Sequence, residues 1–130
     1  MAKIRIIDDD VEQCALLSAA LKRAGHVVSM FHQIDGAWEA LEAEQPDLVL
    51  LDVMFPENAS GGLELVLKIR QNEKTKHLPV ILLTNINEVF PIALSRKDID
   101  PKWMPAQDFL DKPVDSQGLL QKVAEVLKQP

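Results

Sequence analysis

Acidic side chains directly follow apolar runs at two places in this 130-residue chain. Asp8 and Asp9 come after residues 4–7, and Asp52 ends a run that covers residues 48–51. If the two runs are neighbouring parallel strands, the three carboxylates meet at one edge of a sheet. Carboxylates crowded into a poorly solvated cleft repel one another, so such a cleft favours a divalent cation. A site with only oxygen ligands, most of them carboxylates, suits Mg²⁺.

Two further side chains with useful chemistry also follow apolar runs. Thr84 comes after residues 79–83, and Lys112 stands between the pair Phe109-Leu110 and Pro113. A carboxylate such as that of Asp52 can accept a phosphoryl group as a mixed anhydride. The Lys112 ammonium would bind a phosphoryl oxygen as negative charge develops, and the Thr84 hydroxyl would donate a hydrogen bond to it. These residues predict phosphoryl transfer onto Asp52.

The elements that position these residues alternate along the chain. Apolar runs predict strands at residues 4–7, 27–31, 48–51, 79–83 and 109–110, and helical periodicity predicts amphipathic helices between and after them. Asp10 is expected to cap the first helix, Gly25 to end it, and Asp35 to begin the second. The side chains expected to face inward are Cys14, Leu17, Leu21 and Ala24; then Ile34, Ala37, Trp38 and Leu41; then Leu63, Val66 and Leu67; and last Leu120, Val123, Ala124 and Leu127.

This alternation of strands and helices predicts an α/β fold with a doubly wound parallel sheet, organised as a single domain over residues 1–130. Ligands of such sheets bind beyond the carboxyl ends of the strands. The acids, Thr84 and Lys112 all fall at or just past those ends. The fold prediction and the chemistry therefore point to the same edge of the sheet.

Composition narrows the range of partners and compartments. The chain has 20 acidic and 14 basic residues, a net charge of −6, which disfavours binding to nucleic acid or to an anionic membrane surface. No apolar run has the length of a membrane span or the form of a secretory signal, so we expect a cytoplasmic protein. The single cysteine, Cys14, is expected to be a buried thiol.

The ordered positions Asp8-Asp9, Asp52, Thr84 and Lys112-Pro113 resemble the receiver domain of two-component response regulators. The resemblance covers essentially the whole chain. It implies a flavodoxin-like, five-stranded parallel sheet with strand order 2-1-3-4-5. Because no output domain follows in the sequence, the chain looks like a stand-alone receiver, similar to the regulators of chemotaxis.

The resemblance also implies a role for each matching residue. Asp52 would take the phosphoryl group from a phosphohistidine on a sensor histidine kinase or a phosphotransfer protein. Asp9, Asp52 and the backbone carbonyl of Met54 would bind Mg²⁺, with Asp8 acting largely through water. Thr84 and Phe109 would form a switch that changes the face built from the fourth helix, the fifth strand and the fifth helix. That face would bind an output protein, which the sequence does not identify.

Two segments depart from the family pattern. The loop over residues 53–61 is a residue or two longer than usual, and residues 84–112 are several residues longer and rich in proline. A fourth helix is expected within residues 85–107, but the output partner and the mode of dimerisation cannot be carried over from the family. Met54 and Ile86, at the positions that flank the phosphate site in the family's pattern, have no side chain to orient an attacking water. We therefore expect slow self-dephosphorylation.

The sequence leaves several alternative functions open. A phosphatase of the haloacid-dehalogenase type also uses an aspartate after a buried strand and Mg²⁺, but it needs a second acid where this chain has Met54. A flavin-binding module of flavodoxin type shares the sheet, although the acids at 8–10 would repel its phosphate. A receiver-like scaffold that is never phosphorylated is a further reading. Asp8 to Asp10 alone would fit a solvated helix start, and the three histidines lack metal-ligand spacing.

Overall fold

The computed structural model describes residues 2–53, 55, 61–84, 108–111 and 114–128. Its strands form one five-stranded parallel sheet in the order β2-β1-β3-β4-β5, which confirms the predicted fold class and strand order. The strands are β1 (Lys3–Ile7), β2 (Val27–Phe31), β3 (Leu48–Asp52), β4 (Val80–Thr84) and β5 (Asp108–Asp111). The helices are α1 (Val11–Arg23), α2 (Ala37–Glu44), α3 (Gly61–Gln71) and α5 (Ser116–Leu127).

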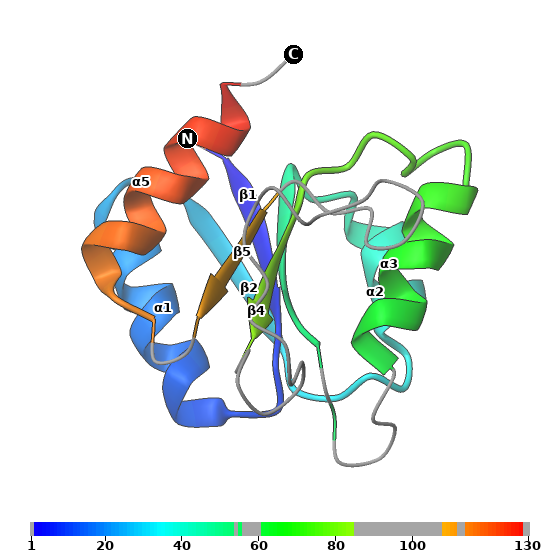
Figure 1. Ribbon diagram of the computed structural model, residues 1–130, viewed down its shortest axis with the longest axis horizontal. Helices are drawn as coiled ribbons and strands as arrows, with labels where there is room; N and C mark the ends of the chain where they lie inside the picture. Colours follow the sequence, from blue (N-terminus) through cyan, green and yellow to red (C-terminus); the bar gives the residue numbers. More distant parts are fainter. Residues whose placement is uncertain (1, 54, 56–60, 85–107, 112–113, 129–130) are drawn as a thin grey trace.

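Helices cover both faces of the sheet. In Figure 1, α1 and α5 lie on one side of the strands, and α2 and α3 lie on the other. Successive side chains of a strand point to opposite faces, so each strand contributes to two apolar layers. Ile4, Ile6 and Leu50 pack with the α1 and α5 layer, whereas Ile7 and Leu51 pack with the α2 and α3 layer. Every residue of β3 is buried, as expected for a central strand covered on both sides.

The first helix begins and ends as the sequence predicts. Asp10 is its N-cap, and the Asp10 carboxylate accepts a 3.0 Å hydrogen bond from the backbone N–H of Gln13. At the other end, Gly25 takes a positive φ of 95°, a conformation that ends many helices. The prediction that Ala24 faces inward is wrong, because Ala24 is the C-cap residue and is exposed.

The other three helices differ from the prediction in where they begin or in which face is buried. α2 begins at Ala37, after Gly36 at φ 81°, and not at Asp35. In α3 the buried face is made by Leu65, Val66 and Ile69, while Leu67 is 40% exposed. In α5 the buried residues are Leu119, Val123 and Val126, and Ala124 is exposed. Apolar residues one position apart define two overlapping stripes on a helix, and only packing against the sheet selects between them.

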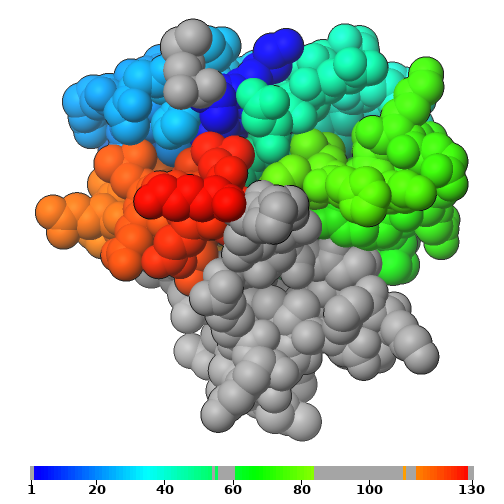
Figure 2. Space-filling model, turned by 90° about the horizontal axis from the view of Figure 1, so that it is seen from above, coloured from blue at the N-terminus to red at the C-terminus, as the bar shows by residue number. Residues whose placement is uncertain are grey.

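The ends of the described chain lie together. The beginning of β1 and the end of α5 are on the same edge of the molecule (Figure 1), which Figure 2 shows from above. All strands start at this amino edge and run toward the opposite, carboxyl edge. The fourth helix expected within residues 85–107 lies outside the described residues. Among the helices that the structure describes, none has the length and apolar character needed to cross a bilayer.

Candidate functional site

The register of the central strands brings the predicted acids together. Ile7 of β1 pairs with Leu51 of β3, so the residues that follow them, Asp8 and Asp52, leave the sheet side by side. The carboxylates of Asp8, Asp9 and Asp52 each offer an oxygen, and these three oxygens lie within 4.8 Å of one another. Asp8 is fully buried, Asp52 is 6% exposed, and Asp9 is exposed. The structure therefore unites the three predicted acids in a cluster that is open on one side.

Hydrogen bonds fix Asp8 within this cluster. Its Oδ1 accepts a 3.0 Å hydrogen bond from the backbone N–H of Asp10, and its own N–H donates to the carbonyl of Phe31 at 3.0 Å. The Asp8 carbonyl accepts from the thiol of Cys14 at 3.4 Å, and Cys14 is buried as predicted. These contacts attach the end of β1 to both β2 and α1. A buried carboxylate held in this way is preorganised for a ligand.

The three consecutive acids thus have three different environments. Asp8 is buried at the end of β1, Asp9 is exposed at the rim of the cluster, and Asp10 caps α1. Backbone geometry at a strand-to-helix junction separates the side chains, although they are adjacent in sequence. Only Asp8 and Asp9 join Asp52, so Asp10 is outside the predicted metal site, as expected.

The acid cluster fits a small divalent cation. Mg²⁺ binds oxygens at about 2.0–2.1 Å in octahedral geometry, which separates neighbouring ligand oxygens by about 3 Å and opposite ones by about 4.2 Å. The spread of at most 4.8 Å between the carboxylate oxygens is close to this range, so small side-chain adjustments suffice. The donors are all carboxylate oxygens, the ligand type that Mg²⁺ prefers.

The remaining predicted residues are described in part or not at all. Thr84 ends β4, one residue past Leu83, which is the register partner of Asp52. The backbone of Thr84 is therefore at the same edge as the acids. Phe109 is in β5, paired with Leu82, and the side chains of Thr84 and Phe109 are not described. Lys112 and Met54 lie outside the described residues, so their predicted roles are untested.

A histidine at this edge was not expected from the sequence. Nδ1 of His32 lies 3.1 Å from the Asp8 carbonyl oxygen, within hydrogen-bond distance. His32 follows β2, whose last residue Phe31 pairs with Ile7. The signal in the sequence was the position of His32 directly after a predicted strand. His32 supports the backbone of Asp8 and is not part of the carboxylate cluster.

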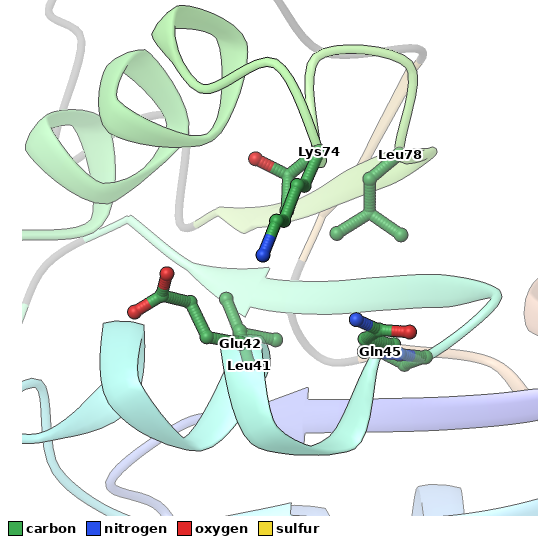
Figure 3. A pocket seen from close by; sticks show the side chains of 7 residues that line it. Leu41, Glu42, Gln45, Lys74 and Leu78 are labelled. Carbon is green, nitrogen blue, oxygen red and sulfur yellow. The ribbon is translucent and has the colours of Figure 1, made fainter.

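A separate cavity of about 360 Å³ lies at the amino edge, beside the starts of β3 and β4. In Figure 3 the side chains of Glu42 and Lys74 point into it from opposite walls, and Leu41 and Leu78 contribute apolar surface. Ligands of a doubly wound sheet bind beyond the carboxyl ends of the strands, whereas this cavity lies at their amino ends. The acid cluster at the carboxyl edge is therefore the candidate functional site.

Comparison with known protein families agrees with this assignment. The family described as the response regulator receiver domain matches residues 4–124. PilH of Pseudomonas aeruginosa is 29% identical over an alignment of 130 positions that covers 98% of this chain and 98% of PilH. The DNA-binding dual master transcriptional regulator RpaA of Synechocystis is 33% identical over an alignment of 131 positions that covers 99% of this chain and 50% of RpaA. The chain thus spans about half the length of RpaA and of several other curated relatives it matches.

Solved structures share the fold. The chemotaxis protein CheY4 of Vibrio cholerae superposes with a TM-score of 0.80 at 25% identity, covering 97% of this chain and 98% of CheY4. Its similarity extends over all the elements that build the acid cluster. The comparisons give no support to the haloacid-dehalogenase alternative.

Proposed function

The chain belongs to the response regulator receiver family, and we propose that it accepts a phosphoryl group on Asp52 from a histidine kinase or a phosphotransfer protein. The observation that carries this proposal is the cluster of Asp8, Asp9 and Asp52 at the carboxyl edge, with ligand oxygens no more than 4.8 Å apart. Asp52 is suited to be the acceptor because it ends the central strand and is almost buried. A nucleophile in that place is held rigidly by strands on both sides.

Asp8 and Asp9, together with Asp52, would hold Mg²⁺. When bound, the cation would offset the repulsion among the carboxylates and the charge of the incoming phosphoryl oxygens. Asp8 is oriented for this by the N–H of Asp10, whereas Asp9 at the exposed rim can adjust to the ion. The backbone carbonyl of Met54 is the proposed remaining protein ligand.

In the transfer itself, a carboxylate oxygen of Asp52 attacks the phosphorus atom of the donor phosphohistidine. The new O–P bond forms as the N–P bond breaks, and the leaving imidazole nitrogen takes up a proton. Lys112 is proposed to bind a phosphoryl oxygen, and Thr84 to donate a hydrogen bond to the aspartyl phosphate. The same reaction with a small acyl phosphate would give self-phosphorylation without a kinase.

The output of the phosphorylated chain is proposed to be a change in its protein-binding face. Thr84 would move toward the phosphoryl group, and Phe109 would turn into the space it leaves. The two residues belong to adjacent strands, since β4 pairs with β5, and this adjacency supports a coupled movement. The partner that reads the face is an output protein of unknown identity.

Intact-mass spectrometry after incubation with acetyl phosphate and Mg²⁺ tests the proposal. The wild type should gain one labile HPO₃ group, and Asp52→Asn should gain none. Asp35→Asn, which removes an exposed acid outside the cluster, is the matched control and should behave as the wild type. A wild type that stays unmodified, or an adduct that maps to another residue, would refute the assignment of Asp52.

A second experiment separates a switch from a passive scaffold. Proteins captured from a cell extract are compared with and without beryllofluoride, which mimics the phosphoryl group on an aspartate. A partner that binds only in its presence, and not to Asp52→Asn, supports the switch. Identical capture in all conditions would favour a scaffold.

A further inference from the structure

Gly62 packs backbone to backbone against the residues at the end of β3. A Cβ atom added at Gly62 would lie 2.2 Å from the carbonyl oxygen of Asp52 and 2.6 Å from that of Val53. It would also lie 2.7 Å from the Val53 Cα. All three atoms belong to the backbone, so rotation of a side chain cannot relieve the overlap. Any residue other than glycine at this position must displace either α3 or the end of β3.

The same peptide segment is held from its other side. The N–H of Val53 donates to the carbonyl of Leu83 in β4 at 3.3 Å, while the carbonyl of Val53 accepts from the N–H of Gly62 at 3.2 Å. Val53 is almost completely buried. These two hydrogen bonds therefore hold the chain immediately after Asp52 between β4 and the first turn of α3.

Glycine is required at position 62 because there is no room for a side chain, and not because of its backbone conformation. Gly62 has no positive φ, in contrast to Gly25 and Gly36, so an L residue could adopt its backbone angles. Glycine is also a poor residue for a helix. The neighbouring Gly61 differs, because the three atoms nearest its added Cβ all belong to the side chain of Ile34, the closest at 3.0 Å. A shift of a few tenths of an ångström in that side chain would relieve this contact, so an added methyl group should disturb the chain less at position 61 than at position 62.

We propose that Gly62 is a positioning residue for phosphoryl acceptance: its missing side chain lets α3 hold the Asp52–Val53 peptide where the Asp52 carboxylate meets Asp8 and Asp9. This inference rests on the proposed function of Asp52. A methyl group at position 62 pushes the peptide away from α3. The carboxylate of Asp52 then leaves the 4.8 Å cluster with Asp8 and Asp9, and both the nucleophile and the cation site are misplaced.

The test compares Gly62→Ala with two controls. Gly61→Ala adds the same methyl group one residue earlier, and Leu65→Ala destabilises α3 by removing a buried apolar side chain without adding an atom next to the Asp52–Val53 peptide. For each variant, the rate of phosphorylation by acetyl phosphate and the dissociation constant of Mg²⁺ are measured, the latter by NMR chemical shifts of the Asp9 and Asp52 amides. Circular dichroism verifies that each protein is folded.

Gly62→Ala should be phosphorylated about 10- to 100-fold more slowly than the wild type, the loss expected for a nucleophile displaced by about 1 Å. It should also bind Mg²⁺ more weakly. Both controls should retain rates and Mg²⁺ affinities close to those of the wild type. If Gly62→Ala is unfolded in buffer, all variants are compared in trimethylamine N-oxide at a concentration that restores its circular dichroism.

The outcomes are distinguishable. A wild type that is not phosphorylated refutes the function of Asp52. A phosphorylated wild type with Gly62→Ala as active as Gly61→Ala refutes the positioning role. An equal loss in Leu65→Ala also overturns it, because reduced stability would then explain the effect.

Discussion

The backbone N–H of Asp10 donates a 3.0 Å hydrogen bond to Oδ1 of the buried Asp8, while the side chain of Asp10 caps α1. The start of the first helix and the orientation of an acid in the candidate metal site are thus set by one residue. Because Asp8 is also bound through its N–H to β2, its carboxylate is fixed before any cation arrives. A bound cation would reduce the repulsion between Asp8, Asp9 and Asp52.

Mg²⁺ should therefore stabilise the folded chain. A ligand that binds only the folded state at 100 times its dissociation constant adds about 2.7 kcal/mol to the free energy of unfolding. Asp9→Asn removes one ligand and one negative charge, so the metal-free variant should be more stable than the metal-free wild type, and its gain from Mg²⁺ should be smaller. Urea unfolding with and without Mg²⁺ measures both effects.

Glu12→Gln is the control for this experiment, since Glu12 is an exposed acid in the first turn of α1 outside the cluster. Its gain from Mg²⁺ should equal that of the wild type. Equal gains for Asp9→Asn and the wild type would contradict the metal site.

The exposed apolar residues of α1 predict a docking surface for a protein phosphodonor. Val11 and Leu16 are 59% and 71% exposed, and α1 begins directly after the acid cluster. A phosphohistidine must approach Asp52 closely, so the protein that carries it covers the surrounding surface, whereas acetyl phosphate does not. Leu16→Glu should slow transfer from a phosphorylated phosphotransfer protein by about tenfold or more, the effect of losing an anchoring side chain.

Phosphorylation of Leu16→Glu by acetyl phosphate should remain normal. Leu67→Glu, at a 40% exposed leucine of α3 in the opposite layer, is the control and should leave both rates unchanged. If Leu16→Glu slows both donors equally, the effect is on the site and not on docking.

Gln45 is the one non-glycine residue with a positive φ among the residues that the structure describes, with φ 53° and ψ 64°. It ends α2, and its N–H donates to the carbonyl of Leu41 at 2.9 Å. A residue with a Cβ atom in this left-handed conformation costs about 1–2 kcal/mol of stability relative to glycine. Glycine in turn costs about 0.4–1 kcal/mol, because it gives the unfolded chain more conformational freedom. Gln45→Gly should therefore raise the free energy of unfolding by about 0.5–1 kcal/mol in urea denaturation.

Gly25→Ala, which places a Cβ atom at a position with positive φ, is the control for Gln45→Gly. Gly25 has φ 95°, and an added Cβ there would meet nothing within 4 Å. Gly25→Ala should therefore destabilise the chain through backbone conformation alone, without a clash. If Gly25→Ala is neutral and Gln45→Gly is not stabilising, left-handed conformation does not limit the stability of these two helix ends.

Short apolar runs separated by amphipathic segments were sufficient to place the five strands, and the resemblance to the receiver family supplied their order. The sequence was also sufficient for the acid cluster, since parallel strands end at one edge and Asp8 and Asp52 each follow a strand. It was not sufficient for the inward faces of α3 and α5, where Leu67 and Ala124 proved to be exposed. Which residues of a helix face inward depends on how the helix is rotated about its own axis against the sheet, and periodicity does not determine that rotation. The close approach of Gly62 to the Asp52 carbonyl likewise exists only after α3 has packed against the end of β3.

The residues of the chain also predict the lifetime of the aspartyl phosphate. Hydrolysis requires a water in line with the O–P bond, and a polar side chain beside the phosphoryl group can orient that water. Met54 has only a weakly accepting thioether, and Ile86 has no polar atom, so decay should be slow. Both residues lie outside the described part of the chain.

Met54→Asn and Ile86→Glu should each shorten the lifetime severalfold when the protein is phosphorylated with acetyl phosphate, desalted and followed by intact mass. Met54→Leu and Ile86→Val keep the positions apolar and should decay at the rate of the wild type. If neither polar variant decays faster than its apolar control, water orientation at these positions does not limit the lifetime.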